Sequence, residues 1–160
     1  MDAIRREAAA CFALCHAADV PLLVNDYVDI AVEIGADGAH IGQGDLSPKS
    51  AREMLGADKI LGLTAFTAEQ LDMVDPALVD YVGTGPVFPT LTDKGKPVLG
   101  VEGFEILAAM SPVPVVAIGG ITPECAMEIT LAGAAGLAVM RSIGAADDVE
   151  AAVRAFQSVL

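Results

Sequence analysis

Positive charge is scarce in this sequence, and its scarcity excludes two classes of partner. Nine lysine and arginine residues stand against 22 aspartate and glutamate residues, which gives a formal net charge of -13. Nucleic acids and anionic membranes carry phosphates that such a field repels, so neither is expected as a partner. A small phosphorylated ligand is still compatible with this charge, provided that a metal ion, backbone N–H groups or a few local cations hold it.

Cysteine and long hydrophobic runs are equally scarce. The three cysteines, Cys11, Cys15 and Cys125, follow neither zinc-ligand nor disulfide spacing. Cys11 and Cys15 lie four residues apart on one face of an expected helix, so we predict buried free thiols. No apolar run approaches the roughly 20 residues of a membrane span, and the N-terminus has no secretory signal pattern. We therefore expect a cytoplasmic protein.

What the sequence does contain is a large apolar fraction, broken into short segments. Hydrophobic residues make up 54% of the 160 residues and charged residues 19%, which excludes a disordered chain and fits a single domain over residues 1–160. Six short apolar runs predict strands, and helical patterns alternate with them. The predicted strands are 21–24, 38–41, 59–64, 80–83, 113–118 and 136–140. The predicted helices are 1–19 with Asp2 as N-cap, 27–34 ending at Gly35, 47–55 capped by Ser47, a short one capped by Thr67, 101–110, 122–133, and one capped by Asp147 or Asp148 that runs to the end.

This alternation predicts an α/β fold with a parallel sheet that helices cover on the outside. The unit recurs roughly every 20 residues, which is typical of a TIM-type (β/α)8 barrel. No glycine-rich dinucleotide turn follows any strand, so an open doubly wound sheet is disfavoured. A complete barrel needs eight strands and the chain begins with a helix. We therefore expect an N-terminally truncated barrel of about six parallel strands.

Carboxylates follow two neighbouring strands. Asn25 and Asp26 come after the first predicted strand, and Asp45 comes after the second. The carboxyl ends of parallel barrel strands face one way, so these side chains are expected in the same mouth. Two carboxylates there could hold Mg²⁺ together with substrate phosphate oxygens. The alternative is that Asp26 and Asp45 are helix N-caps, a position that aspartate favours.

Two later segments are candidate phosphate sites. Gly119 and Gly120 follow a predicted strand and precede a helix, and Met140, Arg141 and Ser142 follow the next strand. Glycine lets backbone N–H groups approach a phosphate closely, and barrels commonly bind phosphate at their last two loops. The alternative is a glycine turn without a ligand.

The long loop after the fourth predicted strand carries hydroxyls and cations. Thr90 and Thr92 precede Lys94, and the segment could fold over a bound anion, or it could be only a solvated loop. Among the histidines, His16 is predicted on a helix surface, and His40 is predicted to be a satisfied core residue.

Together, the segments VNDYVDIAVEIGADGAHIGQGD, ILGLTAFT, YVGTGPVFPTLTDKGKP, VVAIGGIT and GLAVMRSI resemble thiamine phosphate synthase, in order and over essentially the whole chain. The related thiazole tautomerase shares the barrel and several loops. The resemblance implies a Mg²⁺-dependent transferase. A hydroxymethylpyrimidine diphosphate loses diphosphate, and the nitrogen of a thiazole phosphate attacks the exposed methylene carbon to give thiamine phosphate.

The resemblance also implies roles for particular residues. Asn25, Thr64 and Lys94 would bind the pyrimidine diphosphate, and Asp26 and Asp45 would be the Mg²⁺ ligands. The thiazole phosphate side would be formed by Thr90, Leu91, Thr92, Gly120, Met140 and Arg141.

Three departures from the family pattern matter. Asp93 intervenes before Lys94 in the family's Thr-x-Thr-Lys motif, and Arg141 stands where the family has serine. The family's first strand, helix and second strand, with a Gln-x-Arg-x-Lys motif that grips the diphosphate, are absent. We therefore expect a weakened or unformed diphosphate site in this chain by itself. The unpaired strand edges could pair with a second copy, with a complementing N-terminal segment or with nothing. The alternatives are a thiazole tautomerase and a non-catalytic or partner-completed phosphate-binding remnant.

Overall fold

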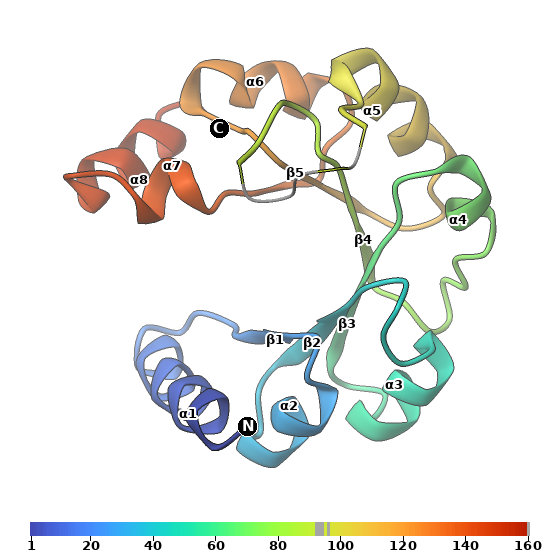
Figure 1. Ribbon diagram of the computed structural model, residues 1–160, viewed down its shortest axis with the longest axis vertical. Coiled ribbons are helices and arrows are strands. Elements are labelled where there is room, and N and C mark those ends of the chain that lie inside the picture. The colour runs from blue at the N-terminus through green and yellow to red at the C-terminus, as the bar shows by residue number, and fades with distance from the viewer. Residues whose placement is uncertain (92–94, 96, 160) are drawn as a thin grey trace. The chain divides into compact units, whose positions relative to one another are not determined.

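The structure, a computed structural model, describes residues 1–91, 95 and 97–159 (Figure 1). Helices and strands alternate along the chain. The strands are β1 (Leu23–Asn25), β2 (Gly38–Ile41), β3 (Ile60–Thr64), β4 (Tyr81–Thr84), β5 (Val115–Ile118) and β6 (Gly136–Ala138). The helices are α1 (Asp2–Ala17), α2 (Val28–Ile34), α3 (Pro48–Leu55), α4 (Ala68–Asp72), α5 (Gly100–Met110), α6 (Pro123–Leu131), α7 (Arg141–Gly144) and α8 (Val149–Gln157).

The chain forms two compact units. The first comprises Met1–Thr64 and Asp75–Tyr81, and the second comprises Ala65–Val74 and Val82–Leu160. In the first unit β1, β2 and β3 are parallel and adjacent in chain order, with Leu23 paired to Gly38 and Gly38 to Ile60. In the second unit β4, β5 and β6 are likewise parallel and adjacent. All six predicted strands and their parallel direction are therefore confirmed.

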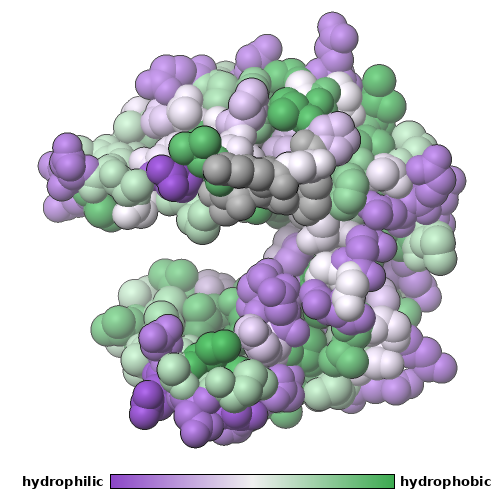
Figure 2. All heavy atoms as spheres, in the orientation of Figure 1, coloured by the Kyte–Doolittle hydropathy of each residue, from purple (hydrophilic) through white to green (hydrophobic). Residues whose placement is uncertain are grey.

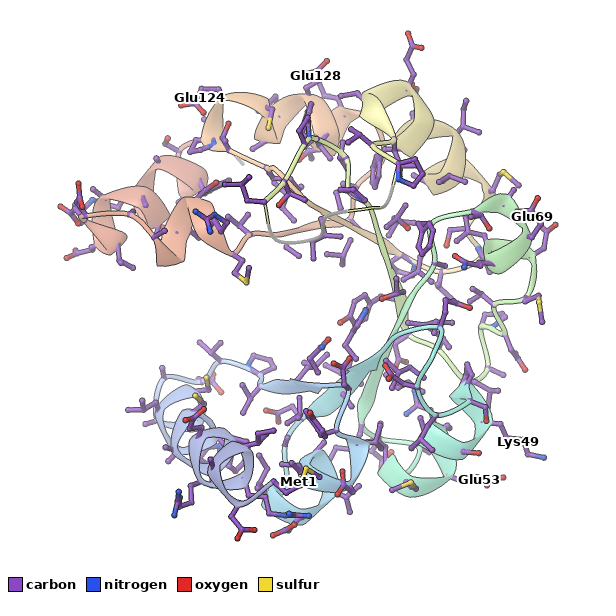
Figure 3. All side chains as sticks on the ribbon, in the orientation of Figure 1. Met1, Lys49, Glu53, Glu69, Glu124 and Glu128 are labelled. Carbon is purple, nitrogen blue, oxygen red and sulfur yellow. The ribbon has the colours of Figure 1, made fainter. Side chains whose placement is uncertain are left out.

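Each unit has an apolar interior where its strands meet its helices. In the first unit, Ile30 of α2, Ile41 of β2 and Leu61 of β3 are completely buried. In the second unit, Phe104 of α5 and Ile129 of α6 are completely buried. Burying each such side chain contributes about 1.5–3 kcal/mol. Charged side chains lie on the outer sides of α3 and α6, and Figure 3 shows Lys49 and Glu53 projecting from α3 and Glu124 and Glu128 projecting from α6 into solvent.

Several helix ends follow from local chemistry, as the sequence predicts. The Ser47 hydroxyl accepts a hydrogen bond from the Ser50 amide, and Pro48 occupies the first turn of α3. The Thr67 hydroxyl and the Asp148 carboxylate cap α4 and α8 in the same way. Gly35 ends α2 in the left-handed conformation, which costs glycine little.

Two local predictions are wrong. Asp2 does not cap α1, because the helix begins at Asp2 itself and Met1 occupies the N-cap position. The cysteines are free thiols, but Cys11 is exposed and Cys15 and Cys125 are half-buried. The reason is that α1 has no buried residue, so its apolar positions remain partly open to solvent. Figure 2 shows hydrophobic surface among the polar side chains of α1, where Leu14 is 73% exposed.

The short segment 75–80 belongs to the first unit because Arg52 and Asp80 tie it there. The guanidinium of Arg52 donates to the Leu78 carbonyl at 2.9 Å and pairs with the Asp80 carboxylate at 2.7 Å. The same carboxylate accepts the Leu61 amide of β3 at 2.7 Å.

Within the described part of the chain, none of the helices is both long and apolar enough to cross a bilayer.

Candidate functional site

Asn25 and Asp26 stand at the carboxyl end of β1, in a turn that the backbone holds firmly. The Asp26 amide donates to the His40 carbonyl at 2.9 Å, and the Tyr27 amide donates to the Asn25 carbonyl at 2.9 Å. Asp26 has a φ of 67°, a left-handed conformation that is uncommon outside glycine, asparagine and aspartate. Such conformations cost free energy and cluster at functional sites.

Asp45 reaches the same place from the turn after β2. Its carboxylate accepts the Gly42 amide at 2.6 Å, which closes the turn. The pKa of Asp26 is raised, first by burial and then by the charge of Asp45 and a hydrogen bond with it, while a hydrogen bond with Asn25 acts in the opposite direction. The two carboxylates are therefore close enough to repel one another.

The N-cap interpretation of these two residues is wrong. Tyr27 occupies the N-cap position of α2, and Ser47 caps α3. Neither carboxylate satisfies the first turn of a helix.

A second group of polar side chains lies beside this pair and joins β2, β3 and Tyr81. The His40 ring bridges two hydroxyls, with Nδ1 at 2.9 Å from the Tyr81 oxygen and Nε2 at 3.0 Å from the Thr64 Oγ1. Burial lowers the pKa of His40, against the opposing charge of Asp45, and burial raises the pKa of Tyr81. Both ring nitrogens have partners, as expected for a satisfied histidine.

The sequence interpretation missed Tyr81 and Gln43 in this group. The Gln43 side-chain amide donates to the Thr64 carbonyl at 2.5 Å. Gly62 was the available signal, because a glycine inside an apolar strand often marks a close approach of neighbouring groups. A Cβ at Gly62 would lie 2.2 Å from Cζ of Tyr81 and 2.4 Å from Nδ1 of His40.

The glycine pair of the second unit lies against the start of the long loop. Gly119 and Gly120 have φ values of 98° and 69°. A Cβ at Gly120 would lie 2.7 Å from Cβ of Phe88, and the Phe88 amide donates to the Gly119 carbonyl at 3.0 Å. Backbone conformation and close packing therefore both require glycine here, and a phosphate-binding role for Gly120 stays a prediction.

Met140 and Arg141 lie after β6 and are exposed, with Met140 at 59%. Arg141 begins α7, a short helix that the sequence analysis did not predict. In the part of the chain that the structure describes, the Arg141 guanidinium makes no ion pair. The Ser142 hydroxyl donates to the Ile121 carbonyl at 2.7 Å, so it links α7 to the segment after the glycine pair.

Three predicted residues lie in the long loop before α5, and a fourth follows them. Thr90 is half-buried and Leu91 is 68% exposed. Thr92 and Lys94 lie outside the described residues. The structure thus brings Asn25, Asp26, Asp45 and Thr64 together in the first unit, whereas Gly120, Met140 and Arg141 belong to the second.

The donor chemistry of the first unit fits a hard divalent cation. Two carboxylates and the Asn25 amide offer oxygen ligands, and Mg²⁺ commonly takes only one or two carboxylates while keeping several waters. Among the described residues no group of three or more histidine, cysteine, aspartate or glutamate side chains is placed to hold a metal.

Parallel strands alternating with helices, with polar side chains after the strand ends, define a TIM-type α/β protein. A solved thiamine phosphate pyrophosphorylase from Pyrococcus furiosus superposes with a TM-score of 0.88 at 30% identity, over 99% of this chain and 76% of that one. A 3-hexulose-6-phosphate synthase with a TM-score of 0.74 and 18% identity shares the fold alone. The predicted fold class is confirmed.

The chain belongs to the thiamine monophosphate synthase family, whose model matches residues 2–143. It is 41% identical to the thiamine-phosphate synthase of Azorhizobium caulinodans, over 99% of this chain and 75% of that protein. It is 49% identical to the thiamine-phosphate synthase of a Psychrobacter species, over 81% of this chain and 62% of that protein. The predicted family is confirmed, and with it an enzyme of the thiamine phosphate synthase type.

Proposed function

We propose that this chain joins a hydroxymethylpyrimidine diphosphate to a thiazole phosphate, giving thiamine phosphate and diphosphate. The carbon–oxygen bond to the diphosphate breaks, and its electron pair leaves with the diphosphate. The thiazole nitrogen then forms a carbon–nitrogen bond to the exposed methylene carbon. No electrons are gained from or lost to a third reactant.

The observation that carries this proposal is the meeting of Asp26 and Asp45 after two adjacent parallel strands. The charge of Asp45 raises the pKa of Asp26, so the repulsion between the two carboxylates is unfavourable in the free protein. Asp26 and Asp45 would hold a divalent cation, whose positive charge would relieve that repulsion. Mg²⁺, when bound, would supply neutralisation of the charge that develops on the departing diphosphate.

The remaining residues of the first unit would position the pyrimidine diphosphate. Asn25, beside the carboxylate pair, offers an amide that can both donate and accept hydrogen bonds. Thr64 offers a hydroxyl at the carboxyl end of β3. Lys94, which belongs to the long loop and not to the first unit, would add a cation for the diphosphate. Since the transferred group needs no acid or base, catalysis consists mainly of orientation and charge stabilisation.

The second unit would hold the nucleophile. Arg141 has no competing ion pair among the described residues and can grip a phosphate with two parallel N–H bonds. The thiazole phosphate side would be completed by Gly120, Met140, Thr90, Leu91 and Thr92. The chain spans between about 60% and three quarters of the bacterial synthases named above, so the activity is proposed for it and is not transferred from them.

Turnover with both substrates, measured with and without Mg²⁺, tests the proposal. We expect thiamine phosphate to form only with Mg²⁺, and Asp26→Asn or Asp45→Asn to lower kcat by about 100-fold or more. Asp29→Asn is the matched control, because Asp29 is an exposed aspartate of α2 that pairs with Arg5 at 3.4 Å. It should leave kcat unchanged.

Other outcomes would contradict the proposal. Full activity in Asp26→Asn would remove the metal role of the carboxylate pair. Binding of thiazole phosphate without any use of the pyrimidine diphosphate would favour the tautomerase. Activity that appears only after a second polypeptide is added would contradict turnover by this chain alone, and it would agree with the weakened diphosphate site expected from the sequence. A cytoplasmic location stays a prediction.

A further inference from the structure

The His40 ring joins two hydroxyls that differ in acidity. This difference decides which partner donates and which accepts in each of the two hydrogen bonds. A neutral imidazole has one N–H donor and one bare nitrogen acceptor. Its two contacts, to Tyr81 at 2.9 Å and to Thr64 at 3.0 Å, therefore allow two arrangements. In one, Tyr81 donates to the ring and the ring donates to Thr64. In the other, every hydrogen points the opposite way.

We propose that Tyr81 and His40 act as positioning residues that fix the Thr64 hydroxyl as a hydrogen-bond donor toward a bound diphosphate. The Tyr81 O–H donates to Nδ1, and the Nε2–H donates to Oγ1 of Thr64. The hydrogen of Thr64 is then free. This inference rests on the proposed function for the identity of the anion, but the direction of the hydrogen bonds follows from the protein alone.

Acidity favours this direction. A phenol, with a pKa near 10, is a much stronger donor than an aliphatic alcohol, and an alcohol oxygen is the better acceptor. The phenol is thus expected to donate to the ring and the alcohol to accept from it.

Hydrogen-bond satisfaction favours the same direction. Among the described residues, His40 is the hydrogen-bond partner of the Tyr81 hydroxyl, and Tyr81 is half-buried. In the reversed arrangement the Tyr81 hydrogen would have no acceptor there, which is costly away from water. In the proposed arrangement, the hydrogen without a protein acceptor is that of Thr64. Thr64 is the last residue of β3, and a bound anion there would offer it an acceptor.

Two neighbours hold the geometry. Gly62 leaves room for both rings, because any side chain at that position would overlap Tyr81 and His40. Gln43 also donates a hydrogen bond of 2.5 Å to the Thr64 carbonyl. The Thr64 backbone and its hydroxyl therefore each have a side-chain partner, Gln43 and His40.

The direction can be measured without any ligand. Nitrogen-15 NMR of the full chain reports which ring nitrogen carries the proton, and His16→Gln leaves His40 as the one histidine. We expect the Nε2–H tautomer, and loss of that single preference in Tyr81→Phe. A Nδ1–H tautomer in the parent chain, or an unchanged tautomer in Tyr81→Phe, would overturn the proposal.

Binding of Mg²⁺ with inorganic diphosphate, followed by calorimetry, tests the consequence. Tyr81→Phe touches no proposed ligand, yet we expect it to raise the dissociation constant about 5- to 10-fold. The same change should have no further effect in a Thr64→Val background and should persist in Thr64→Ser, which keeps the hydroxyl. Tyr27→Phe, at the other tyrosine of the chain, is the matched control.

Failure of the proposed function is distinguishable from failure of this inference. If the parent chain bound no diphosphate while His40 held the Nε2–H tautomer, the proposed function would be contradicted and the direction of the hydrogen bonds supported. If diphosphate bound equally well to the parent and to Tyr81→Phe, the positioning role would be overturned and the proposed function would stand.

Discussion

Asp26 combines two unfavourable features at one residue, a left-handed backbone and a carboxylate that faces a second carboxylate. Its φ of 67° is fixed by the backbone bond to His40, and its pKa is raised by burial and by Asp45. Features of this kind persist where the surrounding structure enforces them, and they are concentrated at functional sites. Asp26 is therefore expected to destabilise the free protein and to contribute to binding.

Asp26→Asn tests the expected destabilisation in the free protein. The folded state binds the Asp26 proton more tightly than the unfolded chain does. The carboxyl therefore contributes stability below its ordinary pKa of 3.8, and that contribution is lost as pH rises through the higher pKa of the folded state. We expect Asp26→Asn to be more stable than the parent at pH 7, with a gain that shrinks as the pH is lowered.

Urea unfolding at several pH values checks this prediction. Asparagine also tolerates the left-handed conformation, but that benefit does not vary with pH, so the pH-dependent part is diagnostic. Asp29→Asn removes the same charge from a residue that is paired with Arg5 and should give no such gain. A parent chain more stable than Asp26→Asn at pH 7 would contradict the expectation.

Gly62 is the second residue whose role depends on its surroundings. Gly62→Ala would place a methyl group 2.2 Å from the Tyr81 ring, and we expect it to lower the free energy of unfolding by about 1–3 kcal/mol through overpacking. Gly44→Ala is the control, because nothing lies within 4 Å of a Cβ built there. Urea unfolding of both variants gives the comparison, and equal effects would rule out the overlap.

At the scale of elements, short helices depend on their first turn. Helix α3 has eight residues, too few to be stable in isolation, and its Ser47 cap satisfies the Ser50 amide at 3.1 Å. The helix also carries Arg52, which ties the segment 75–80 to β3. A weaker α3 would therefore loosen the first unit.

We expect Ser47→Ala to destabilise the protein by about 1 kcal/mol, because the Ser50 amide loses its acceptor. Ser47→Asp keeps an acceptor at the same position and should restore most of the stability. Thermal unfolding of the two variants separates capping from a general sensitivity of this turn. Equal losses in both variants would show that the hydroxyl is not acting as a cap.

At the scale of the whole molecule, a small number of side chains join distant parts of the sequence. Arg52 is the clearest, with a side chain that is 13% exposed and bonds to Leu78, Gly56, Lys59 and Asp80. These bonds bring the segment 75–80 back to the first unit. Lysine cannot reproduce them, because it lacks the planar fork of donors.

Arg52→Lys should therefore lower the free energy of unfolding by about 2–3 kcal/mol. The matched change is Arg154→Lys in α8, where the arginine is 59% exposed and pairs with Glu150 one turn away. That pair should be worth at most about 0.5 kcal/mol. Chemical denaturation of the two variants gives the comparison, and a similar loss in both would contradict the special position of Arg52.

The local features were predictable because they depend on near neighbours in the chain. The caps at Ser47, Thr67 and Asp148, the glycine that ends α2 and the six apolar strands all follow from patterns a few residues long. The parallel strands also predicted that Asp26 and Asp45 would meet. The exposure of Cys11 could not be predicted in this way, because apolar spacing on α1 does not show whether another element covers it.

By itself, then, the sequence determined the order of the strands and of every helix except α7, the family, and the carboxylates that follow β1 and β2. Each of these is encoded in short contiguous segments of the chain. Only the tertiary structure decided that Tyr81 reaches His40 over Gly62, and that Arg52 holds a segment more than 20 residues away. These contacts join side chains from separate elements, and their distances depend on how strands pair and how helices pack.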